Sequence, residues 1–284
     1  MLTDYHLHLR PDDAGTDFDR YFTEENVERY LAAARERGIE ELGVSEHVYR
    51  FTAALELWTH PLWEENAVDD LDAYCEFVRT TPLRLGIECD YVPGAEERTE
   101  ALLAARDLDY VVGSVHFVGE GEAAVDHEGF DVWDSAGSAD EVWRRYFDAF
   151  AACARSGLFD ILAHPDLVKV WGRARPLPEA DLRAFYEPAV EAILEGGGAV
   201  ELSTAGLRKP VGELYPAPEL ARLCAEAGIP FALSSDAHLP EQVGFGYERA
   251  VELLESIGVG EICVFEGRQR RLVPLGAGVP APRG

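Results

Sequence analysis

The residues best suited to chemistry in this chain are histidines and carboxylates that lie at or just after the downstream ends of short apolar runs. Six of the 8 histidines have this position, in the motifs YHLH, VSEH, GSVH, LAHP and SSDAH: His6, His8, His47, His116, His164 and His238. Two carboxylates share it, Glu88 in GIECD and Asp236 in SSDAH. Imidazole and carboxylate together are ligands that divalent Zn, Fe and Mn accept. The sequence therefore predicts two or three metal ions held by these eight residues.

One HxH or DxH pair alone does not distinguish a metal ligand from a hydrogen-bonded structural residue. The prediction depends on the repetition, because none of the eight residues lies in an expected helix. The two remaining histidines, His60 in WTHPLW and His127 in VDHEGF, fall in irregular stretches. We assign both to surface or lid structure, and leave open a place for His127 at the rim of a pocket.

Cationic side chains near these motifs indicate the substrate. The only two lysines, Lys169 and Lys209, follow expected strands, and Arg208 precedes Lys209 in STAGLRKP. Arg10 and Arg173 are further candidates for the same surroundings. Cations beside metal ions suit a phosphate group, so we predict substrate-binding roles for Lys169, Arg208 and Lys209. Chance placement of two lysines is the alternative.

Metal ions and cations together predict hydrolysis of a phosphoester. Divalent ions within about 4 Å of each other can each bind a phosphate oxygen and lower the pKa of a bound water from about 16 to about 7. Arg208, with Lys209 or Lys169, would stabilise the charge that develops on the phosphoryl oxygens. The leaving alkoxide needs a proton or a metal contact. Asp236 or His238 is predicted to supply the proton, and the sequence does not rank the two.

Short apolar runs alternate with amphipathic segments along the whole chain. Eight runs are typical of buried strands: 4–8, 41–46, 83–89, 110–115, 159–163, 198–203, 230–234 and 261–265. The segments between them have helical spacing: 24–37, 68–80, 95–107, 139–156, 179–195, 218–227 and 247–257. Several helices are predicted to end at a glycine in the left-handed conformation: Gly38, Gly157, Gly196, Gly228 and Gly258.

This alternation predicts one α/β domain that resembles a TIM barrel, with an open doubly wound sheet as the alternative. In a β/α barrel the carboxyl ends of all strands face one mouth, so ligands more than 200 positions apart in the sequence would converge there. We place the barrel domain at 1–271. The Pro- and Gly-rich segment 272–284 is expected to be a frayed tail.

The composition excludes several classes of partner. Asp and Glu number 53 against 25 Lys and Arg, and the net charge of −28 repels polyanions such as nucleic acid. No apolar run approaches the roughly 18 residues of a membrane span, and the acidic start is unlike a signal peptide. Five dispersed cysteines without CxxC spacing are typical of a reducing cytoplasm. The expected partner is a small phosphorylated metabolite in the cytoplasm.

The motifs HLH, SEH, GIE, GSVH, HPDL, STAGLRKP and SSDAHLPEQVG resemble those of the polymerase and histidinol phosphatase (PHP) superfamily, and most closely its histidinol-phosphatase branch. The resemblance runs from Tyr5 to about Val264. It implies a distorted barrel of seven strands, with the active site at their C-terminal ends and three metal ions that are Zn, Fe or Mn. It also implies hydrolysis of L-histidinol phosphate to L-histidinol and phosphate in histidine biosynthesis, with STAGLRKP contacting the phosphate.

The resemblance further implies how the ligands are shared. One metal would be held by His6, His8, Glu88 and Asp236. Glu88 would also reach a second metal, with His116 and His164. A third would be held by His47 and His238. Histidinol phosphatases often have a Cys or His ligand a few residues after HxH, whereas this chain has LRPDDAG, so Asp12 or Asp13 replaces that ligand or the third site is weaker or empty.

Two other functions stay open on the sequence alone. A PHP-type nuclease or phosphodiesterase would act on another phosphorylated substrate, although the charge of −28 argues against DNA. A non-enzymatic metal-binding module would bind ions without turnover of any phosphoester.

Overall fold

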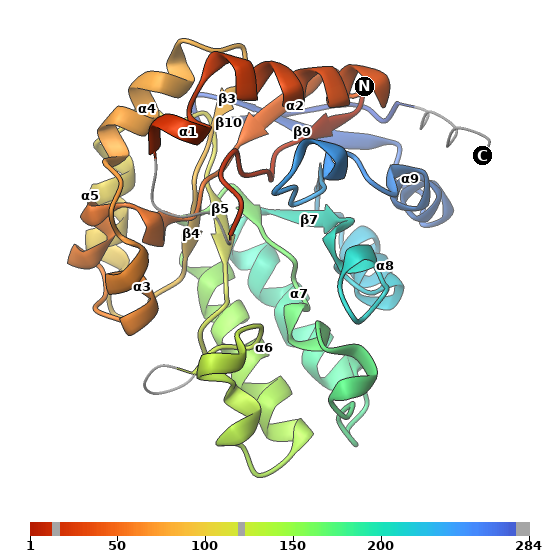
Figure 1. Cartoon of the computed structure of the whole chain (residues 1–284). Coiled ribbons are helices and arrows are strands. Elements are labelled where there is room, and N and C mark those ends of the chain that lie inside the picture. Colours follow the sequence, from red (N-terminus) through yellow and green to blue (C-terminus); the bar gives the residue numbers. More distant parts are fainter. Residues whose placement is uncertain (13–17, 119–122, 277–284) are drawn as a thin grey trace.

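The computed structural model describes residues 1–12, 18–118 and 123–276, and in it helices surround a set of mostly parallel strands (Figure 1). The strands are β1 (Thr3–Asp4), β2 (Glu41–Val44), β3 (Arg84–Leu85), β4 (Glu88–Asp90), β5 (Val112–Ser114), β6 (Ile161–Leu162), β7 (Ala199–Ser203), β8 (Phe231–Ser234), β9 (Glu261–Glu266) and β10 (Gln269–Pro274). The helices are α1 (Phe18–Tyr21), α2 (Glu24–Glu36), α3 (Pro61–Asn66), α4 (Leu71–Arg79), α5 (Glu96–Ala104), α6 (Ala139–Arg155), α7 (Arg183–Gly196), α8 (Pro218–Glu226) and α9 (Tyr247–Ser256).

The helices begin and end where local chemistry satisfies their free backbone groups. The Ser138 side chain accepts a hydrogen bond from the amide of Glu141 at the start of α6 (3.2 Å). Four predicted C-terminal glycines, at 38, 157, 228 and 258, have positive φ. The prediction for Gly196 is wrong by one residue, because α7 continues through it and Gly197 (φ 76°) forms the cap. Gly196 is needed for close packing, since a Cβ there would lie 1.8 Å from the carbonyl oxygen of Ala154.

The strands pair in the order β1-β2-β3 and β4-β5-β6-β7-β8, all parallel. Strands β3 and β4 are two halves of one extended segment, which hydrogen-bonds to the β2 segment through Gly86 N to Val44 O (2.9 Å). At the other edge, His8 N donates to Ala237 O (2.7 Å), which joins β1 to the end of β8. Seven strands, with β3 and β4 counted as one, thus form the predicted distorted barrel.

The eighth apolar run is a strand, but it does not extend this parallel arrangement. It is β9, which pairs with β10 in an antiparallel hairpin from Glu266–Gln269 to Glu261–Pro274. Gly267 and Arg268 form its turn, both with positive φ, as a two-residue hairpin turn requires. The prediction of a frayed tail from Leu272 is therefore wrong for 272–274, where Leu272 and Val273 pair with apolar residues of β9. Residues 277–284 lie outside the described part.

Apolar side chains fill the end of the barrel opposite the predicted mouth. Tyr5, Tyr110 and Phe265 pack edge to face or tilted there, with ring centroids 5.0 to 6.1 Å apart. The Tyr110 side chain fits because its neighbours lack side chains: a Cβ at Gly43 would lie 2.4 Å from its hydroxyl oxygen, and a Cβ at Gly86 would lie 2.3 Å from its ring. The buried histidines His6, His8, His47 and His164 lie instead at the C-terminal strand ends. No helix in the described ranges is both long and apolar enough to cross a bilayer.

Candidate metal centre

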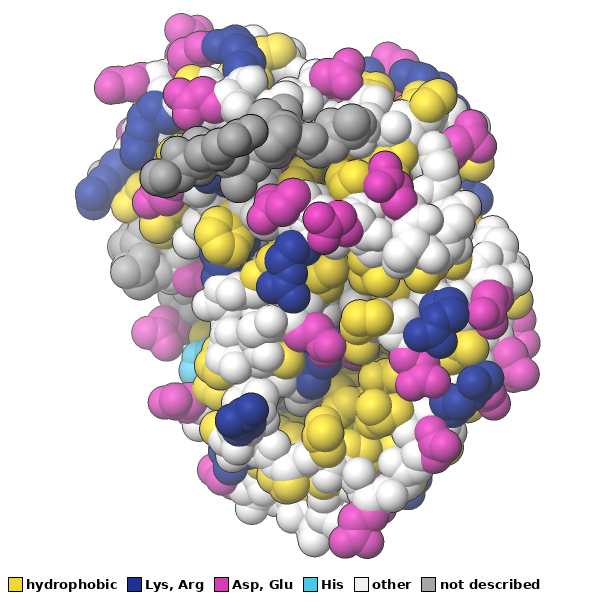
Figure 2. Space-filling model, turned by 90° about the vertical axis from the view of Figure 1, so that its right-hand side faces the viewer, with side chains coloured by type: hydrophobic (Ala, Val, Ile, Leu, Met, Phe, Trp, Pro, Cys, Tyr) yellow, Lys and Arg dark blue, Asp and Glu magenta, His cyan; other side chains and the backbone are white. Residues whose placement is uncertain are grey.

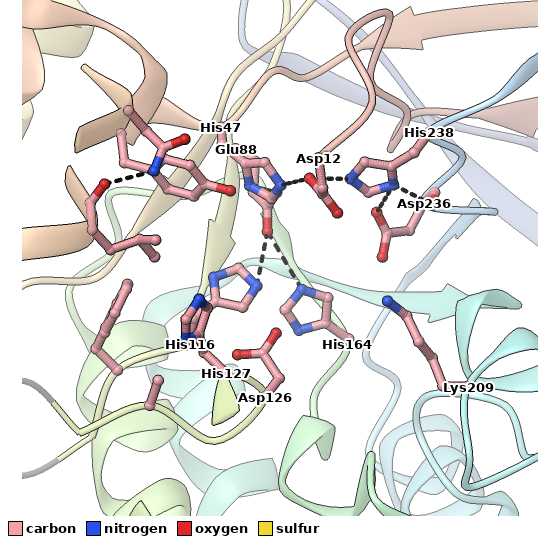
Figure 3. Close-up of a pocket in the computed structure, with 15 residues that line it drawn as sticks. Asp12, His47, Glu88, His116, Asp126, His127, His164, Lys209, Asp236 and His238 are labelled. Atoms are coloured by element: carbon pink, nitrogen blue, oxygen red, sulfur yellow. Dashed lines mark hydrogen bonds and ion pairs between the residues drawn. The ribbon is translucent and has the colours of Figure 1, made fainter. Parts of the chain in front are cut away.

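The barrel brings all eight predicted ligands to its C-terminal mouth, where they surround or adjoin a cavity of about 260 Å³ (Figure 3). They come from the ends of β1, β2, β5, β6 and β8 and from the first residue of β4. Most are buried, with His6, His8, Glu88 and His164 at most 2% exposed. Residues from both ends of the sequence therefore share one small volume.

Glu88 lies at the centre of this arrangement. Its Oε2 is 3.1 Å from His6 Nε2, 3.5 Å from His8 Nε2 and 2.6 Å from His47 Nδ1. Its Oε1 faces the other side, 3.4 Å from His164 Nε2 and 3.6 Å from His116 Nε2. One carboxylate thus presents one oxygen to each of two sets of histidines, which is the geometry of a bridging ligand.

Three groups of side chains are positioned to bind metal ions, each with its ligand atoms within 4.8 Å of one another. They are His6 with His8 and Asp236, Glu88 with His116 and His164, and His8 with His47 and His238. This division follows the one that the family resemblance implies, except that Glu88 is grouped only with His116 and His164, and that His8 also adjoins the third group. The role of each residue as a ligand stays a prediction.

Unpaired polar atoms in these groups fit bound cations. Among the described residues, these buried atoms make no hydrogen bond: His6 Nε2, His8 Nδ1, His8 Nε2, His47 Nδ1, His164 Nδ1, His238 Nε2 and Glu88 Oε2. Several lie close to carboxylate oxygens but without hydrogen-bond geometry. Each buried unsatisfied group costs about 1–3 kcal/mol. Their lone pairs, gathered in one place, are what coordination of divalent metals requires.

A second layer of carboxylates orients the histidine rings. Glu201 Oε1 is 2.7 Å from His6 Nδ1, and Asp90 Oδ1 is 2.7 Å from His116 Nδ1. Glu201 also accepts a hydrogen bond from the backbone amide of His164 (2.5 Å), so it links two of the groups. Such partners fix the tautomer and orientation of a metal-binding histidine. Both carboxylates were missed from the sequence, although a charged residue inside an apolar strand, as in AVELS, is a usable signal.

The charges of the groups stabilise one another. Burial alone would raise the pKa of Glu88, but His47 and His6 hold it well below its ordinary value. Burial would lower the pKa of His6, yet Glu88, Glu201 and Asp236 raise it well above its ordinary value. The raised pKa favours a protonated His6 beside these carboxylates when no metal is bound. A metal ion has to displace this proton, so its affinity depends on pH.

Asp12 lies beside the third group. Its Oδ1 is 3.0 Å from His238 Nε2 and 3.6 Å from His47 Nε2, and it accepts a hydrogen bond from Arg50 Nη2 (2.8 Å). Of the two residues predicted to replace the missing ligand, Asp12 is thus in a suitable place. Asp13 lies outside the described residues.

The three predicted phosphate-binding cations have different surroundings. Lys209 lines the cavity (Figure 3). Arg208 does not line it, because its Nη2 donates to the backbone carbonyls of Ser235 (2.8 Å) and Asp236 (2.9 Å) and so fixes the loop that carries Asp236.

The structure places Lys169 away from the cavity, contrary to the substrate-binding prediction. Its Nζ donates to Glu213 Oε2 (2.7 Å) and to the carbonyl of Leu214 (2.9 Å), and it lies 2.9 Å from Asp166 Oδ2. Asp166 is fully buried, and a buried carboxylate needs a compensating charge. Lys169 therefore pairs with the buried carboxylate of Asp166, whereas the sequence predicted a contact with phosphate. Arg10 is likewise paired with Asp69 (2.5 Å), and Arg173 lines a separate cavity.

The two remaining histidines differ from each other. The assignment of His60 to the surface is wrong, since the residue is 0% exposed and its Nδ1 accepts a hydrogen bond from Leu62 N (3.1 Å) at the start of α3. Trp58 and Phe117 pack against its ring. His127 lines the cavity, and so does Asp126, which was missed because a lone Asp in an irregular stretch carries no pattern.

The fold and the site define a metal-dependent hydrolase built on an α/β barrel. The PHP domain family matches residues 14–205, and the chain belongs to this family. A Deinococcus radiodurans protein named probable histidinol-phosphatase is 36% identical over 258 residues, 86% of this chain and 91% of the relative. The histidinol-phosphatase of Bacillus subtilis is 23% identical over 269 residues, 88% of this chain and 98% of the relative.

A solved structure has the same fold. It is histidinol phosphate phosphatase from Lactococcus lactis, which superposes with a TM-score of 0.73 at 18% sequence identity over 95% of this chain and 98% of its own. The chain is therefore a homologue of histidinol phosphatases with the barrel of that group, and it is an enzyme of the hydrolase class.

Proposed function

We propose that this protein is a metal-dependent phosphomonoesterase that hydrolyses L-histidinol phosphate to L-histidinol and phosphate in histidine biosynthesis. The observation that carries the proposal is one cavity that combines three metal-ligand groups with the ammonium of Lys209. The name of the Deinococcus relative at 36% identity supports the substrate. The Lactococcus structure was determined with Zn, L-histidinol and phosphate, which supports both the ions and the reaction.

The chain would hold two or three divalent ions, Zn, Fe or Mn, through the eight residues of the three groups. Bound there, such ions supply Lewis acidity for the phosphoryl oxygens and a nucleophilic water at neutral pH. Glu88 fixes the spacing of the groups, because both of its oxygens are committed to histidines on opposite sides. Lys209 binds a phosphate oxygen, and Arg208 acts indirectly by holding the Asp236 loop.

Proton donation to the leaving alkoxide was predicted for Asp236 or His238. Burial raises the pKa of Asp236, but His6, His8 and His238 hold it well below its ordinary value. A carboxyl group that stays ionised is a poor acid. His238 Nδ1 faces the carbonyl of Asp236 (3.2 Å). This contact suits a histidine that binds a metal ion through its other ring nitrogen, Nε2. We therefore propose ligand roles for both, with water in the cavity as the proton source.

Replacing Lys209 tests the phosphate contact. Lys209→Gln is expected to lower kcat/KM for L-histidinol phosphate by about 10- to 100-fold, because a charge-assisted hydrogen bond to phosphate contributes about 1.5–3 kcal/mol. Steady-state kinetics checks this, with Arg222→Gln, an exposed residue of α8, as the matched control. Equal kinetics for the two variants would show that Lys209 does not touch the phosphate.

Replacing Lys169 tests its structural role. Lys169→Met leaves buried Asp166 without its cation, so we expect the free energy of unfolding to fall by about 3 kcal/mol, with kcat/KM nearly unchanged. Urea denaturation and kinetics on the same samples measure both quantities. Arg183→Gln, which removes an exposed pair with Glu187, is the control. A loss of activity at unchanged stability would instead indicate that Lys169 binds the substrate.

A substrate screen tests the function as a whole. The metal-loaded protein is assayed against L-histidinol phosphate, other phosphomonoesters and single-stranded DNA, and we expect the first to have the highest kcat/KM. Cleavage of DNA alone would overturn the proposal, and bound metal without any turnover would indicate a metal-binding module. On the face in Figure 2, Lys and Arg side chains are scattered among Asp and Glu rather than gathered into a basic stripe, which supports a small substrate over a polynucleotide.

We also propose that the reaction takes place in the cytoplasm. All five cysteines are free thiols, and four of them are buried, as is usual for proteins of a reducing compartment.

A further inference from the structure

The cavity at the metal centre presents both a cation and an uncommitted anion. Lys209 and Asp126 both line it, and in the view of Figure 3 the His164 ring lies between them. Lys209 follows the loop after β7, whereas Asp126 follows β5 in the segment after His116. A ligand that spans the cavity therefore meets opposite charges at two separate points.

Asp126 is distinguished from the other carboxylates that line the cavity. Glu88 and Asp236 belong to the metal-ligand groups. Asp12 is occupied by Arg50 and His238. Asp126 belongs to none of the three groups. Among the described residues it forms neither an ion pair nor a hydrogen bond, although its charge helps to raise the pKa of His116. Asp126 is exposed and lines the cavity, so it is available to a ligand.

Part of the cavity wall is apolar. Leu62, Phe117 and Ala124 line the same cavity, and Phe117 is held in place by edge contacts with Trp58 and Trp63 at 5.1 and 6.5 Å. A free carboxylate beside such a wall suits an organic cation with a small planar or aliphatic body. An inorganic phosphate or a simple sugar phosphate has no cationic group that could pair with this carboxylate.

We propose that Asp126 is a specificity-determining residue that binds the ammonium group of a phosphorylated amino alcohol, while Lys209 and the ions that the metal-ligand groups would hold receive the phosphate. The inference rests on the proposed function and deepens it, because L-histidinol phosphate carries an ammonium two bonds from the ester carbon. The site then selects zwitterionic phosphomonoesters over those without an amine. A charged contact of this kind changes affinity chiefly for the substrate that carries the partner charge.

The test compares two substrates that share a leaving alcohol and differ in the amine: L-histidinol phosphate and its desamino analogue, 3-(imidazol-4-yl)propyl phosphate. Asp126→Asn is expected to lower kcat/KM for the first by about 10- to 100-fold and for the second by less than about twofold. Glu128→Gln, two residues along the same segment but outside the cavity lining, is the matched control and should change neither. Isothermal titration with L-histidinol gives a second measure, a weaker Kd for Asp126→Asn at unchanged metal content.

The outcomes distinguish a failure of the proposed function from a failure of the proposed ammonium contact. A wild-type protein that is inactive on L-histidinol phosphate but active on another phosphomonoester would overturn the proposed function. A wild-type protein that is active, with an Asp126→Asn variant that loses the same factor on both substrates, would overturn only the ammonium contact and assign Asp126 to the chemical step. Loss of metal from the variant would overturn it as well, since it would make Asp126 a ligand.

Discussion

Glu88→Gln is expected to lower kcat/KM by at least about 10³-fold, or about 4 kcal/mol of transition-state stabilisation. The glutamine has nearly the same shape, but one end of its amide is a donor that would face histidine nitrogens. In the native protein both oxygens face histidines, with Oε2 2.6 Å from His47 Nδ1 and Oε1 3.4 Å from His164 Nε2. The substitution therefore removes a shared ligand from two groups at once.

Metal content gives an independent measure of the same change. Elemental analysis of Glu88→Gln should show fewer ions per chain than the wild-type protein, whereas Glu97→Gln, at an exposed position of α5, should keep both ions and activity. Circular dichroism checks that the variant is folded. A folded variant with full metal content and activity within tenfold of the wild type would exclude a bridging role for Glu88.

The strands and most helices could be predicted because their signals are local. Apolar runs and helical spacing placed every barrel strand and seven of the helices, and the hydrophobic period directly reflects burial. The hairpin partner β10 was missed because its turn is Gly267–Arg268, in which an arginine takes the positive φ usually left to Gly or Asn. Helix α3 was missed since its cap is His60, an uncommon residue for that position.

The site was partly predictable for a related reason. Predicted ligands at the ends of strands meet at one mouth because the barrel brings all its strand ends together. The proximity of His6 and His238 could therefore be predicted from the sequence alone. The positions of other residues could not be predicted in this way. Lys169 follows β6, but buried Asp166 three residues earlier binds its ammonium, and that pairing depends on tertiary burial. Asp126 reaches the cavity from an irregular segment, where no period indicates the direction of a side chain.

The second carboxylate layer explains why the site holds its shape. Glu201 is fully buried and contacts His6, the amide of His164 and the hydroxyl of Ser234 (2.6 Å). Asp4 is also fully buried, and it accepts a hydrogen bond from the amide of Ser235 (3.0 Å), beside Asp236. These hydrogen bonds thus hold the predicted ligands in place at the strand ends. Preorganisation of this kind lowers the cost of metal binding.

Removal of the metals with a chelator is expected to abolish turnover and to lower Tm, with both restored by added Zn. An ion present at about 1,000 times its Kd stabilises the folded state by about 4 kcal/mol. The difference in Tm between loaded and metal-free protein should also widen from about pH 6 to about pH 8. In the metal-free protein the pKa values of His6 and His116 lie well above their ordinary 6.5 because of neighbouring carboxylates, although burial alone would lower them.

The expected pH dependence of the Tm difference follows from these raised pKa values. A raised pKa stabilises the metal-free fold below pH 6.5, and that contribution is lost as the pH rises toward the folded-state value. Metal binding behaves oppositely, since its ligands must be deprotonated and its affinity increases with pH. Differential scanning calorimetry of both forms at several pH values measures the gap. A gap that stays constant or narrows toward pH 8 would mean that these histidines do not exchange protons for metal.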